Sequence, residues 1–434
     1  MFSDIIFAFI VIIYLSFITY KGYLINFLPS SAWLTFMLTP FVQSIEYFED
    51  TQNQKIGIII FQLAFFAGDL ISLKYGKKYN SAGKRDNSLI IVMVATPVFL
   101  VPMIHLLLVG KIPLYSYFFE GTSVLEFEQD RYDFNRGGIP FWFGFLTNWT
   151  ISIFGVLVIA NLLIKRKYLL TSFLIIWIGI YTIFSGAKGS IAVFLFSILA
   201  LFCIIGSIKS KVLSNFVIYF SFCLIIISGI LLSEKAISGI EKCPVPYGAN
   251  PSPANILRSC SADNEISLNP IVDTLGYRVF LTPVEVSNNW YDYYGDSSVS
   301  KRTFLEVTQR QDNKKAANLI AQEFYAKYWP KKYSSLTQAN SSIDADAFSI
   351  GGLLFVFLFA VFIFFLRILI SALKYDDIFS NSLYIVGTVS LSLLPFSSSI
   401  QAIFVPWGFG LIVFMMIFNK FLYKNQIRFI SRPN

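Results

Sequence analysis

Long apolar runs constrain this 434-residue chain more than any other feature of its sequence. A helix needs roughly 20 apolar residues to cross the hydrocarbon core of a bilayer. A window of that length finds eleven runs, at 4–20, 24–45, 55–73, 88–110, 140–164, 168–185, 190–207, 212–232, 349–373, 380–398 and 403–419. We therefore expect an all-α polytopic membrane protein with about eleven transmembrane helices. Only 14% of the residues are charged, against about 25% in soluble domains, which excludes an ordinary soluble enzyme.

The basic residues predict how these helices are oriented. Lys and Arg number 34 and Asp and Glu 26, and most of the cations fall in alternate connections. These cationic connections are 21, 74–85, 165–167, 209–211, 374 and 420–432. Under the positive-inside bias they are cytoplasmic, so the N-terminus is expected outside and the C-terminus inside. The net charge of +8 is then mostly a topology signal, and nucleic acid is not an expected partner.

One polar segment interrupts the apolar pattern. It is far longer than an ordinary connection between helices, and loops of that length are usually functional or disordered. The expected organisation is transmembrane helices 1–8 over 1–232 with a smaller outer loop at 111–139, a large outer loop over 233–348, and helices 9–11 with a basic tail over 349–434.

The large loop has features of its own. Apolar residues at helical spacing predict short interfacial helices at 273–290 and 313–329. Cys243 and Cys260 both fall in this loop, where an extracytoplasmic compartment permits a disulfide between them. The other two cysteines lie within spans and are expected to be packing residues.

Candidate catalytic groups gather in residues 276–296. If this stretch is helical, Arg278 and Thr282 share one face and Glu285 follows a turn later. An arginine fork suits a phosphate or diphosphate, and a nearby carboxylate can accept a proton from a sugar hydroxyl. Asp292 is a second carboxylate, inside an aromatic patch made of Trp290, Tyr291, Tyr293 and Tyr294. The alternative is a surface ion pair with aromatic anchors at the membrane surface.

Further cations lie on the outer side, against the topology bias. They are Arg131, Arg136, Lys188, Lys331 and Lys332, and we expect them to bind an anionic substrate group. Lys188 sits in a short glycine-flanked turn, where exposed backbone amides suit an anion. The single histidine, His105, lies within the fourth span, where an interhelical hydrogen bond competes with a proton-relay role. One histidine and four cysteines leave little material for a metal site, so none is expected.

Together these features resemble the bacterial O-antigen polymerase (Wzy-type) family. The residues that carry the resemblance are an Arg-x-Phe-x-x-Pro element at Arg278, Phe280 and Pro283, the Trp-Tyr-Asp-Tyr-Tyr run at 290–294, the turn Gly186-Ala-Lys-Gly189, and an Asn-rich stretch that leads through Gly351-Gly352 into the next span. The resemblance covers most of the chain in topology, while its residue motifs are short. The turn departs from the family by carrying Lys188 where arginine is common.

The resemblance implies a GT-C-like glycosyltransferase of lipopolysaccharide biosynthesis, which polymerises undecaprenyl-diphosphate-linked repeat units into O-antigen or a similar polysaccharide. It places the chain in the bacterial inner membrane with the large loop in the periplasm. The partners it implies are lipid-linked glycans and the bilayer, with a chain-length regulator and a flippase as candidates. Outer-loop arginines are essential in the family, and Arg278, Arg131 and Arg136 match here. No cofactor is expected, and no metal is required if these cations neutralise the diphosphate.

In the expected mechanism, a hydroxyl of one lipid-linked unit attacks the anomeric carbon of another, and the diphosphate leaves. Arg278, with Lys188 and Arg131 or Arg136, stabilises the charge, and the aromatic patch packs against sugar faces or lipid headgroups. Glu285 is the first choice for the base and Asp292 the second, with Asp344 and Asp346 behind them.

Three alternatives stay open. O-antigen ligases resemble this architecture but rely on a histidine in the large outer loop, and this loop has none. A flippase or transporter is expected to place ionisable residues at mid-membrane. Here Asp69 and Arg367 lie toward the inner ends of their spans, where snorkelling to the membrane surface is the simpler expectation. A non-enzymatic structural partner in a polysaccharide assembly complex is the third.

Overall fold

The computed structural model describes residues 2–44, 52–75, 88–121, 130, 133–134, 139–184, 188–205, 208–240, 282–308, 310–321, 342–373, 378–392, 394 and 408–430. These described residues are helical with short turns and contain no strand, which confirms the all-α prediction for them. The chain divides into two compact units. The first comprises Met1–Leu73, Phe216–Ile368 and Leu391–Ala402, and the second Lys74–Asn215, Leu369–Ser390 and Ile403–Asn434.

Several of the described helices have the length and apolar character of membrane spans. Three stretches meet both criteria, at Gln52–Lys74, Trp142–Ile164 and Leu353–Ala372. A fourth candidate is the pair Val94–Val109 and Pro113–Phe119, which is bent by 55°. Shorter apolar helices cover Ile6–Tyr20, Tyr168–Phe184, Phe194–Cys203, Ser210–Leu224 and Phe409–Asn419. The fold is thus compatible with a membrane protein, although fewer spans meet these criteria than the eleven predicted.

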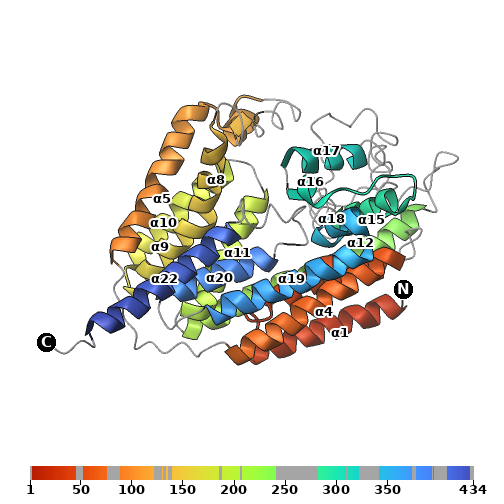
Figure 1. Ribbon diagram of the computed structural model, residues 1–434, viewed down its shortest axis with the longest axis horizontal. Coiled ribbons are helices and arrows are strands. Elements are labelled where there is room, and N and C mark those ends of the chain that lie inside the picture. Colours follow the sequence, from red (N-terminus) through yellow and green to blue (C-terminus); the bar gives the residue numbers. More distant parts are fainter. Residues whose placement is uncertain are drawn as a thin grey trace. The chain divides into compact units, whose positions relative to one another are not determined.

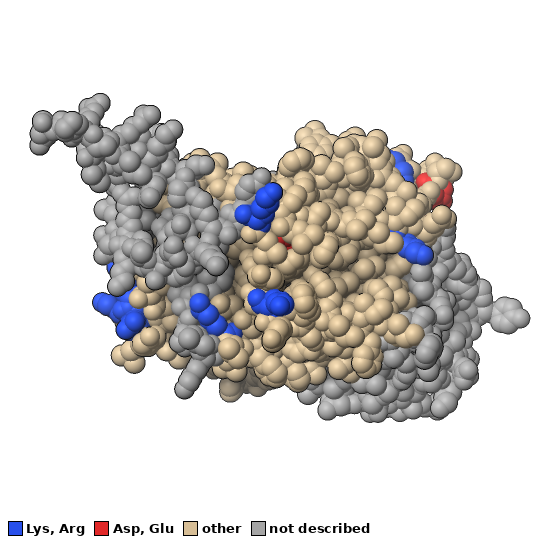
Figure 2. Space-filling view, turned by 90° about the horizontal axis from the view of Figure 1, so that it is seen from below, with Lys and Arg blue, Asp and Glu red and all other residues tan. Residues whose placement is uncertain are grey.

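The exposed side chains are also compatible with a membrane protein. Large apolar residues such as Phe9, Leu107 and Leu169 are exposed over more than half of their surface. On the face shown in Figure 2, uncharged residues cover most of the described surface, and only a few separate Lys, Arg, Asp and Glu side chains interrupt it. Such a surface would be poorly hydrated in water and is well suited to lipid.

The first unit is built around four long helices: α1 (Phe2–Tyr20), α4 (Gln52–Tyr75), α12 (Ile208–Ile240) and α19 (Leu353–Ala372). Between α1 and α4 the chain forms α2 (Leu28–Trp33), the π-helix η1 (Leu34–Leu38) and α3 (Thr39–Ser44). Trp33 locks this broken helix to α4, because its indole stacks on Phe61 at 5.1 Å and its Nε1 donates to the Ile58 carbonyl at 3.0 Å.

Two prolines explain where that helix breaks. Pro29 lies in the first turn of α2, where a missing N–H costs no hydrogen bond. Pro40 lies two residues after the end of η1 and cannot donate to the preceding turn, so the chain widens locally into a π-helix. Pro29 and Pro40 therefore lie close to segment boundaries, whereas Pro97 lies inside an unbroken helix, α5 (Ser88–Val109).

The second unit packs α5 against α9 (Gly155–Ile164), and α9 in turn against α10 (Tyr168–Phe184) and α11 (Lys188–Ile205). The π-helix η3 (Thr150–Phe154) joins α8 (Phe141–Trp149) to α9, and α6 (Pro113–Phe119) follows α5. Two helices from the C-terminal part of the chain, α20 (Ile378–Ser392) and α22 (Phe409–Ile430), complete the helices described for this unit.

The polar segment before α19 carries four described helices, α15 (Thr282–Gly295), α16 (Phe304–Thr308), α17 (Arg310–Ala321) and α18 (Ile343–Gly351). In Figure 1 they gather beside one end of α4 and α19. A side-chain contact agrees with this placement: the Gln54 amide near the start of α4 donates to the Val284 carbonyl of α15 at 2.9 Å. The segments predicted to be helical at 273–290 and 313–329 correspond in part to α15 and α17.

Two helix ends differ from the ends of the apolar runs that flank this polar segment. α12 continues to Ile240, beyond the run that ends at 232. Within the run that begins at 349, Gly352 has φ 66° and separates α18 from α19. That backbone conformation is accessible to glycine at little cost, so the chain turns there before the apolar helix starts.

Candidate functional site

The candidate site lies where α15 packs on α18. The face of α15 that contacts α18 carries Ser287, Trp290, Tyr291 and Tyr294, spaced so that they lie on successive turns of one helix face. All four are buried, with Ser287 fully inaccessible and Trp290 exposed over only 1% of its surface. Burial of these aromatic side chains, together with that of Val284 and Val286 on the same helix, holds α15 in place.

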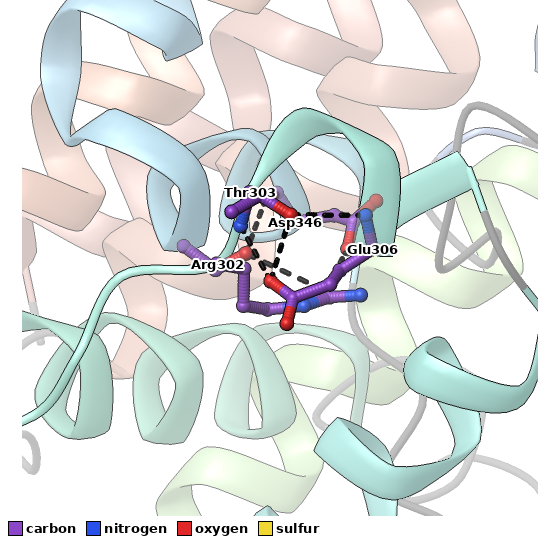
Figure 3. A network of polar contacts seen from close by, with 5 residues as sticks. Arg302, Thr303, Glu306 and Asp346 are labelled. Atoms are coloured by element: carbon purple, nitrogen blue, oxygen red, sulfur yellow. Dashed lines mark hydrogen bonds and ion pairs between the residues drawn. The ribbon is translucent and has the colours of Figure 1, made fainter.

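An arginine and an aspartate form a buried ion pair at this contact (Figure 3). Arg302 Nη1 lies 2.8 Å from Asp346 Oδ1, and the Asp346 side chain is completely buried. The Arg302 backbone amide also donates to the Ser349 carbonyl at 2.9 Å, which fixes the segment before α16 on α18. The guanidinium carbon lies 5.6 Å from the centre of the Trp290 ring, a cation–π distance.

The second carboxylate oxygen of this pair is unusual. Asp346 Oδ2 is buried and has no hydrogen-bond partner among the described residues. Burial raises the pKa of Asp346 to about 7, against the opposing charge and hydrogen bond of Arg302. A carboxylate that titrates near neutrality and has an open lone pair is suited to accept a proton. Burial also raises the pKa of the neighbouring Tyr294 to about 12, so its hydroxyl stays protonated.

Asp344, two residues earlier on α18, is held differently. Its carboxylate accepts from the Ser342 hydroxyl, from backbone amides in the first turn of α18, and from the Tyr291 hydroxyl at 3.3 Å. Burial still raises the pKa of Asp344 to about 6, although these hydrogen bonds oppose the rise. A carboxylate at a helix N-terminus with several donors is a structural arrangement.

Tyr291 joins this arrangement to α4. Its ring lies 4.4 Å from that of Phe348 on α18, and its hydroxyl sits so close to Gly57 of α4 that a Cβ there would collide with it. Burial, followed by the charge of Asp344, raises the pKa of Tyr291 well above its ordinary value. The absence of a side chain at residue 57 thus lets the α15–α18 pair dock on α4.

The segment between α15 and α16 is ordered by a capping box. Thr303 Oγ1 accepts from the Glu306 amide at 3.2 Å, and the Glu306 carboxylate accepts from the Thr303 amide at 2.6 Å. That second bond is the main reason the pKa of Glu306 is lowered. On the other side of Arg302, exposed Lys301 places its ammonium 4.8 Å from the centre of the Phe348 ring. Both neighbours of Arg302 are therefore anchored.

Many of the predicted site residues cannot be compared with this geometry. Arg278, Arg131, Arg136, Lys331, Lys332, Cys243 and Cys260 lie outside the described residues. Glu285 falls within α15 and Lys188 at the first position of α11, but their side chains are outside the described part. Asp292 is described, and it is exposed on the side of α15 away from the buried face.

The aromatic residues predicted to form a platform are mostly buried in the structure. We expected Trp290, Tyr291, Tyr293 and Tyr294 to pack against sugars or lipid headgroups. Trp290, Tyr291 and Tyr294 are instead buried, with at most 4% of their surfaces exposed, and contact protein groups. Tyr293 alone among these four is partly exposed. Alternate residues of a helix point to different sides, so a run of five adjacent residues cannot present all its rings to one ligand.

The prediction that Asp69 and Arg367 snorkel was also wrong. Both side chains are completely buried, and Arg367 Nε donates to Asp69 Oδ1 at 2.6 Å. The other carboxylate oxygen accepts from the Ser30 amide at 3.1 Å, and Arg367 Nη2 donates to the Asn26 carbonyl at 2.7 Å. Snorkelling was inferred from distance along the helix, whereas partners 298 residues apart in sequence decide the outcome.

Arg302 is the residue that the sequence reasoning missed. It lies in the segment that the sequence predicts to be outside, against the topology bias, and so met the condition by which the other predicted outer cations were chosen. Its pairing with Asp346, 44 residues away, had no signal in the sequence. Among the described residues, no group of three His, Cys, Asp or Glu side chains could hold a metal ion.

Comparison of the chain with protein-family models, with curated proteins and with solved structures finds no match. Any functional conclusion therefore depends on the residues and geometry of this chain.

Proposed function

We propose that the protein is a polytopic membrane glycosyltransferase that polymerises undecaprenyl-diphosphate-linked repeat units into O-antigen or a similar surface polysaccharide, at the periplasmic face of the bacterial inner membrane. The observation that carries the proposal is the buried Arg302–Asp346 pair, whose Asp346 Oδ2 has no partner among the described residues. The sequence resemblance supplies the substrate class, and this pair supplies a base suited to the reaction.

The proposal assigns eleven spans, with the N-terminus periplasmic and the C-terminus cytoplasmic. The helical stretches α1, α2–η1–α3, α4, α5, α8–η3–α9, α10, α11, α12, α19, α20 and α22 correspond in order to the eleven apolar runs. In this orientation the first residues of α4 and α19 face the periplasm. The contacts of Gln54 and Gly57 with α15 support the same sidedness, because they attach the polar segment to that end of α4.

In the proposed reaction, Asp346 Oδ2 takes the proton of an acceptor sugar hydroxyl, and the hydroxyl oxygen attacks the anomeric carbon of the growing glycan. The anomeric carbon–oxygen bond breaks, and the electron pair leaves with the undecaprenyl diphosphate. Arg302 orients Asp346 through the 2.8 Å ion pair. Since the pair is buried, the site must open when substrate binds. Arg278, Arg131, Arg136 and Lys188 remain the candidates for holding the diphosphate.

The lipid-linked glycan and the bilayer are the partners this reaction requires, and a chain-length regulator and a flippase are further candidates. A buried ion pair within apolar helices, such as Asp69–Arg367, would also suit a transporter. Both Asp69 oxygens accept hydrogen bonds from fixed protein donors, however, which suits helix packing better than an exchangeable ion or proton. We therefore propose a glycosyltransferase and not a transporter.

The lipopolysaccharide of a deletion strain tests this proposal. A polymerase defect leaves one repeat unit on the lipid A core, without the ladder of lipopolysaccharide bands that carry more repeat units. The wild-type gene restores this ladder. Bare core would indicate a ligase or an export defect and would contradict the proposal. Purified protein should also polymerise lipid-linked repeat units unaided, which a structural partner cannot do. Arg278→Ala at normal protein level should abolish the ladder, and a normal ladder would remove Arg278 from the site.

A further inference from the structure

A second cation stands next to Arg302 in the chain, and unlike Arg302 it is exposed. Lys301 lies in the short segment between α15 and α16, and its ammonium is 4.8 Å from the centre of the Phe348 ring of α18, a cation–π distance. The Phe348 ring is buried and packs against the Tyr291 ring at 4.4 Å. The ammonium is therefore held against an aromatic ring that is itself packed in place.

The backbone that carries Lys301 is fixed as well. The next amide, that of Arg302, donates to the Ser349 carbonyl at 2.9 Å, and the Arg302 guanidinium pairs with Asp346 at 2.8 Å. Asp346, Phe348 and Ser349 fall within about one turn of α18. The same turn of α18 thus carries the carboxylate that we propose as the base and the ring beside the Lys301 ammonium.

The Lys301 ammonium has no counter-ion among the described residues. The ion pairs described for the segment from α15 to α18 are Arg302–Asp346 and Lys315–Asp312, and neither involves Lys301. The pKa of Lys301 is lowered because its surroundings remove part of its hydration, and no neighbouring carboxylate offsets that loss. A cation that is partly dehydrated and unpaired is stabilised when it binds an anion.

The position of Lys301 selects the kind of anion. Phe348 precedes Leu353 by five residues, and Leu353 begins α19, which is long and apolar enough to cross a membrane. A side chain beside Phe348 therefore lies close to the membrane–water interface, where the phosphate groups of lipids are abundant anions. A lysine ammonium binds phosphate as a point charge.

We propose that Lys301 binds a phosphate group of the lipid-linked substrate, beside the Arg302–Asp346 pair. Because Lys301 is exposed, the phosphate reaches it without entering the buried contact between α15 and α18. In the proposed reaction this group is the diphosphate, whose negative charge increases as the anomeric carbon–oxygen bond breaks, and the ammonium stabilises that charge. The assignment to the diphosphate rests on the proposed function, whereas the anion site at Lys301 does not.

Native mass spectrometry of the full-length protein in detergent, titrated with undecaprenyl diphosphate, tests this site. Lys301→Met keeps an unbranched apolar side chain against Phe348 and removes the charge, so the dissociation constant should rise about tenfold. Lys301→Arg keeps the charge and should bind within about twofold of the wild type. The matched control is Lys315→Met, which removes another exposed cation of the same segment, and its affinity should stay within about twofold of the wild type.

An unchanged dissociation constant in Lys301→Met would overturn the site. An equal loss in Lys315→Met would also overturn it, because it would reflect the overall surface charge. Phosphatidylglycerol is the second probe, and the wild type should bind it at least about tenfold more weakly. Equal affinity for the two lipids would indicate an ordinary headgroup site and would overturn the assignment to the substrate. If binding depends on Lys301 and the wild type does not polymerise lipid-linked units, the proposed function fails and the anion site stands.

Discussion

Two buried Arg–Asp pairs in the first unit, Arg367–Asp69 and Arg302–Asp346, have the same chemistry and different surroundings. Both Asp69 oxygens accept hydrogen bonds, from Arg367 and from the Ser30 amide. Asp346 accepts from Arg302 through one oxygen, and its other oxygen has no partner among the described residues. Burying a charge pair is costly unless its remaining lone pairs are satisfied. Hydrogen bonding of the carboxylate, and not burial alone, therefore distinguishes the pair that we assign to packing from the pair that we propose to be reactive.

Helix α4 contacts the regions of both Arg–Asp pairs, and at each contact a glycine of α4 makes room for the other residue. Gly57 makes room for the Tyr291 hydroxyl, which bonds Asp344 on α18, and Gly68 makes room for the Arg367 side chain. The two glycines are eleven residues apart, which is about 16 Å along a helix. One helix therefore supports the packing pair near one end and the candidate site near the other.

The largest expected effect concerns the packing pair. Arg367→Met leaves Asp69 buried without its cation and should destabilise the protein by about 3–5 kcal/mol. The double variant with Asp69→Leu removes both charges and should recover most of that loss. Thermal unfolding in detergent, followed by size-exclusion chromatography, measures the stability of the single and the double variant. A single variant as stable as the wild type would contradict a packing role.

The pH dependence of stability comes next and concerns Asp344. Its folded pKa of about 6 lies above the ordinary value of 3.8, so the folded state binds the proton more tightly than the unfolded state. Stability from this group is complete below about pH 4 and is lost as pH rises through about 6, by up to about 3 kcal/mol. Asp344→Asn cannot titrate, so its unfolding temperature should fall less than that of the wild type between pH 4 and 7. Equal slopes would contradict the raised pKa.

The two glycines of α4 allow a matched comparison. Gly57→Ala and Gly68→Ala each insert a methyl group into a packed contact and should cost about 1–3 kcal/mol. Gly57→Ala displaces Tyr291 and should also lower polymerisation, whereas Gly68→Ala should affect only stability. The lipopolysaccharide ladder that each variant produces, divided by the amount of that variant in the membrane, measures the difference in polymerisation between the two variants. Equal activity per folded molecule would mean that the docking of α15 and α18 on α4 does not matter for function.

The smallest effect concerns the capping box beside Arg302. Thr303→Ala removes the oxygen that accepts from the Glu306 amide and should cost about 1 kcal/mol. Local hydrogen exchange should rise around α16 and stay unchanged around Asp69. Increased exchange around Asp69 would show that the two regions are not independent.

The sequence predicted the helices of this protein well, because apolar runs depend on residues close together in the chain. The first run, 4–20, coincides with most of α1, and 168–185 with α10. Contacts between distant residues were not predictable. Nothing local to Asp69 indicates Arg367, and nothing local to Arg302 indicates Asp346, so one pair was given the wrong role and the other was missed.

Within the candidate site, the sequence indicated the stretch around 290–294 but not how its residues are packed. Trp290, Tyr291 and Tyr294 lie on the buried face of α15. Asp346 ranked behind Glu285 and Asp292 because the ranking used distance from Arg278 in sequence. Burial and pairing, which change the basicity of a carboxylate, appear only when the helices are packed together.

Polymerisation by Asp346→Asn tests the central claim most directly, with Asp344→Asn on the same helix as the control. Both substitutions preserve size, and only the first removes the carboxylate with an unpartnered oxygen. At equal membrane levels, Asp346→Asn should slow polymerisation by about 10²–10⁴-fold and leave a single repeat unit on the core, while Asp344→Asn keeps a ladder. A normal ladder from folded Asp346→Asn would contradict the account.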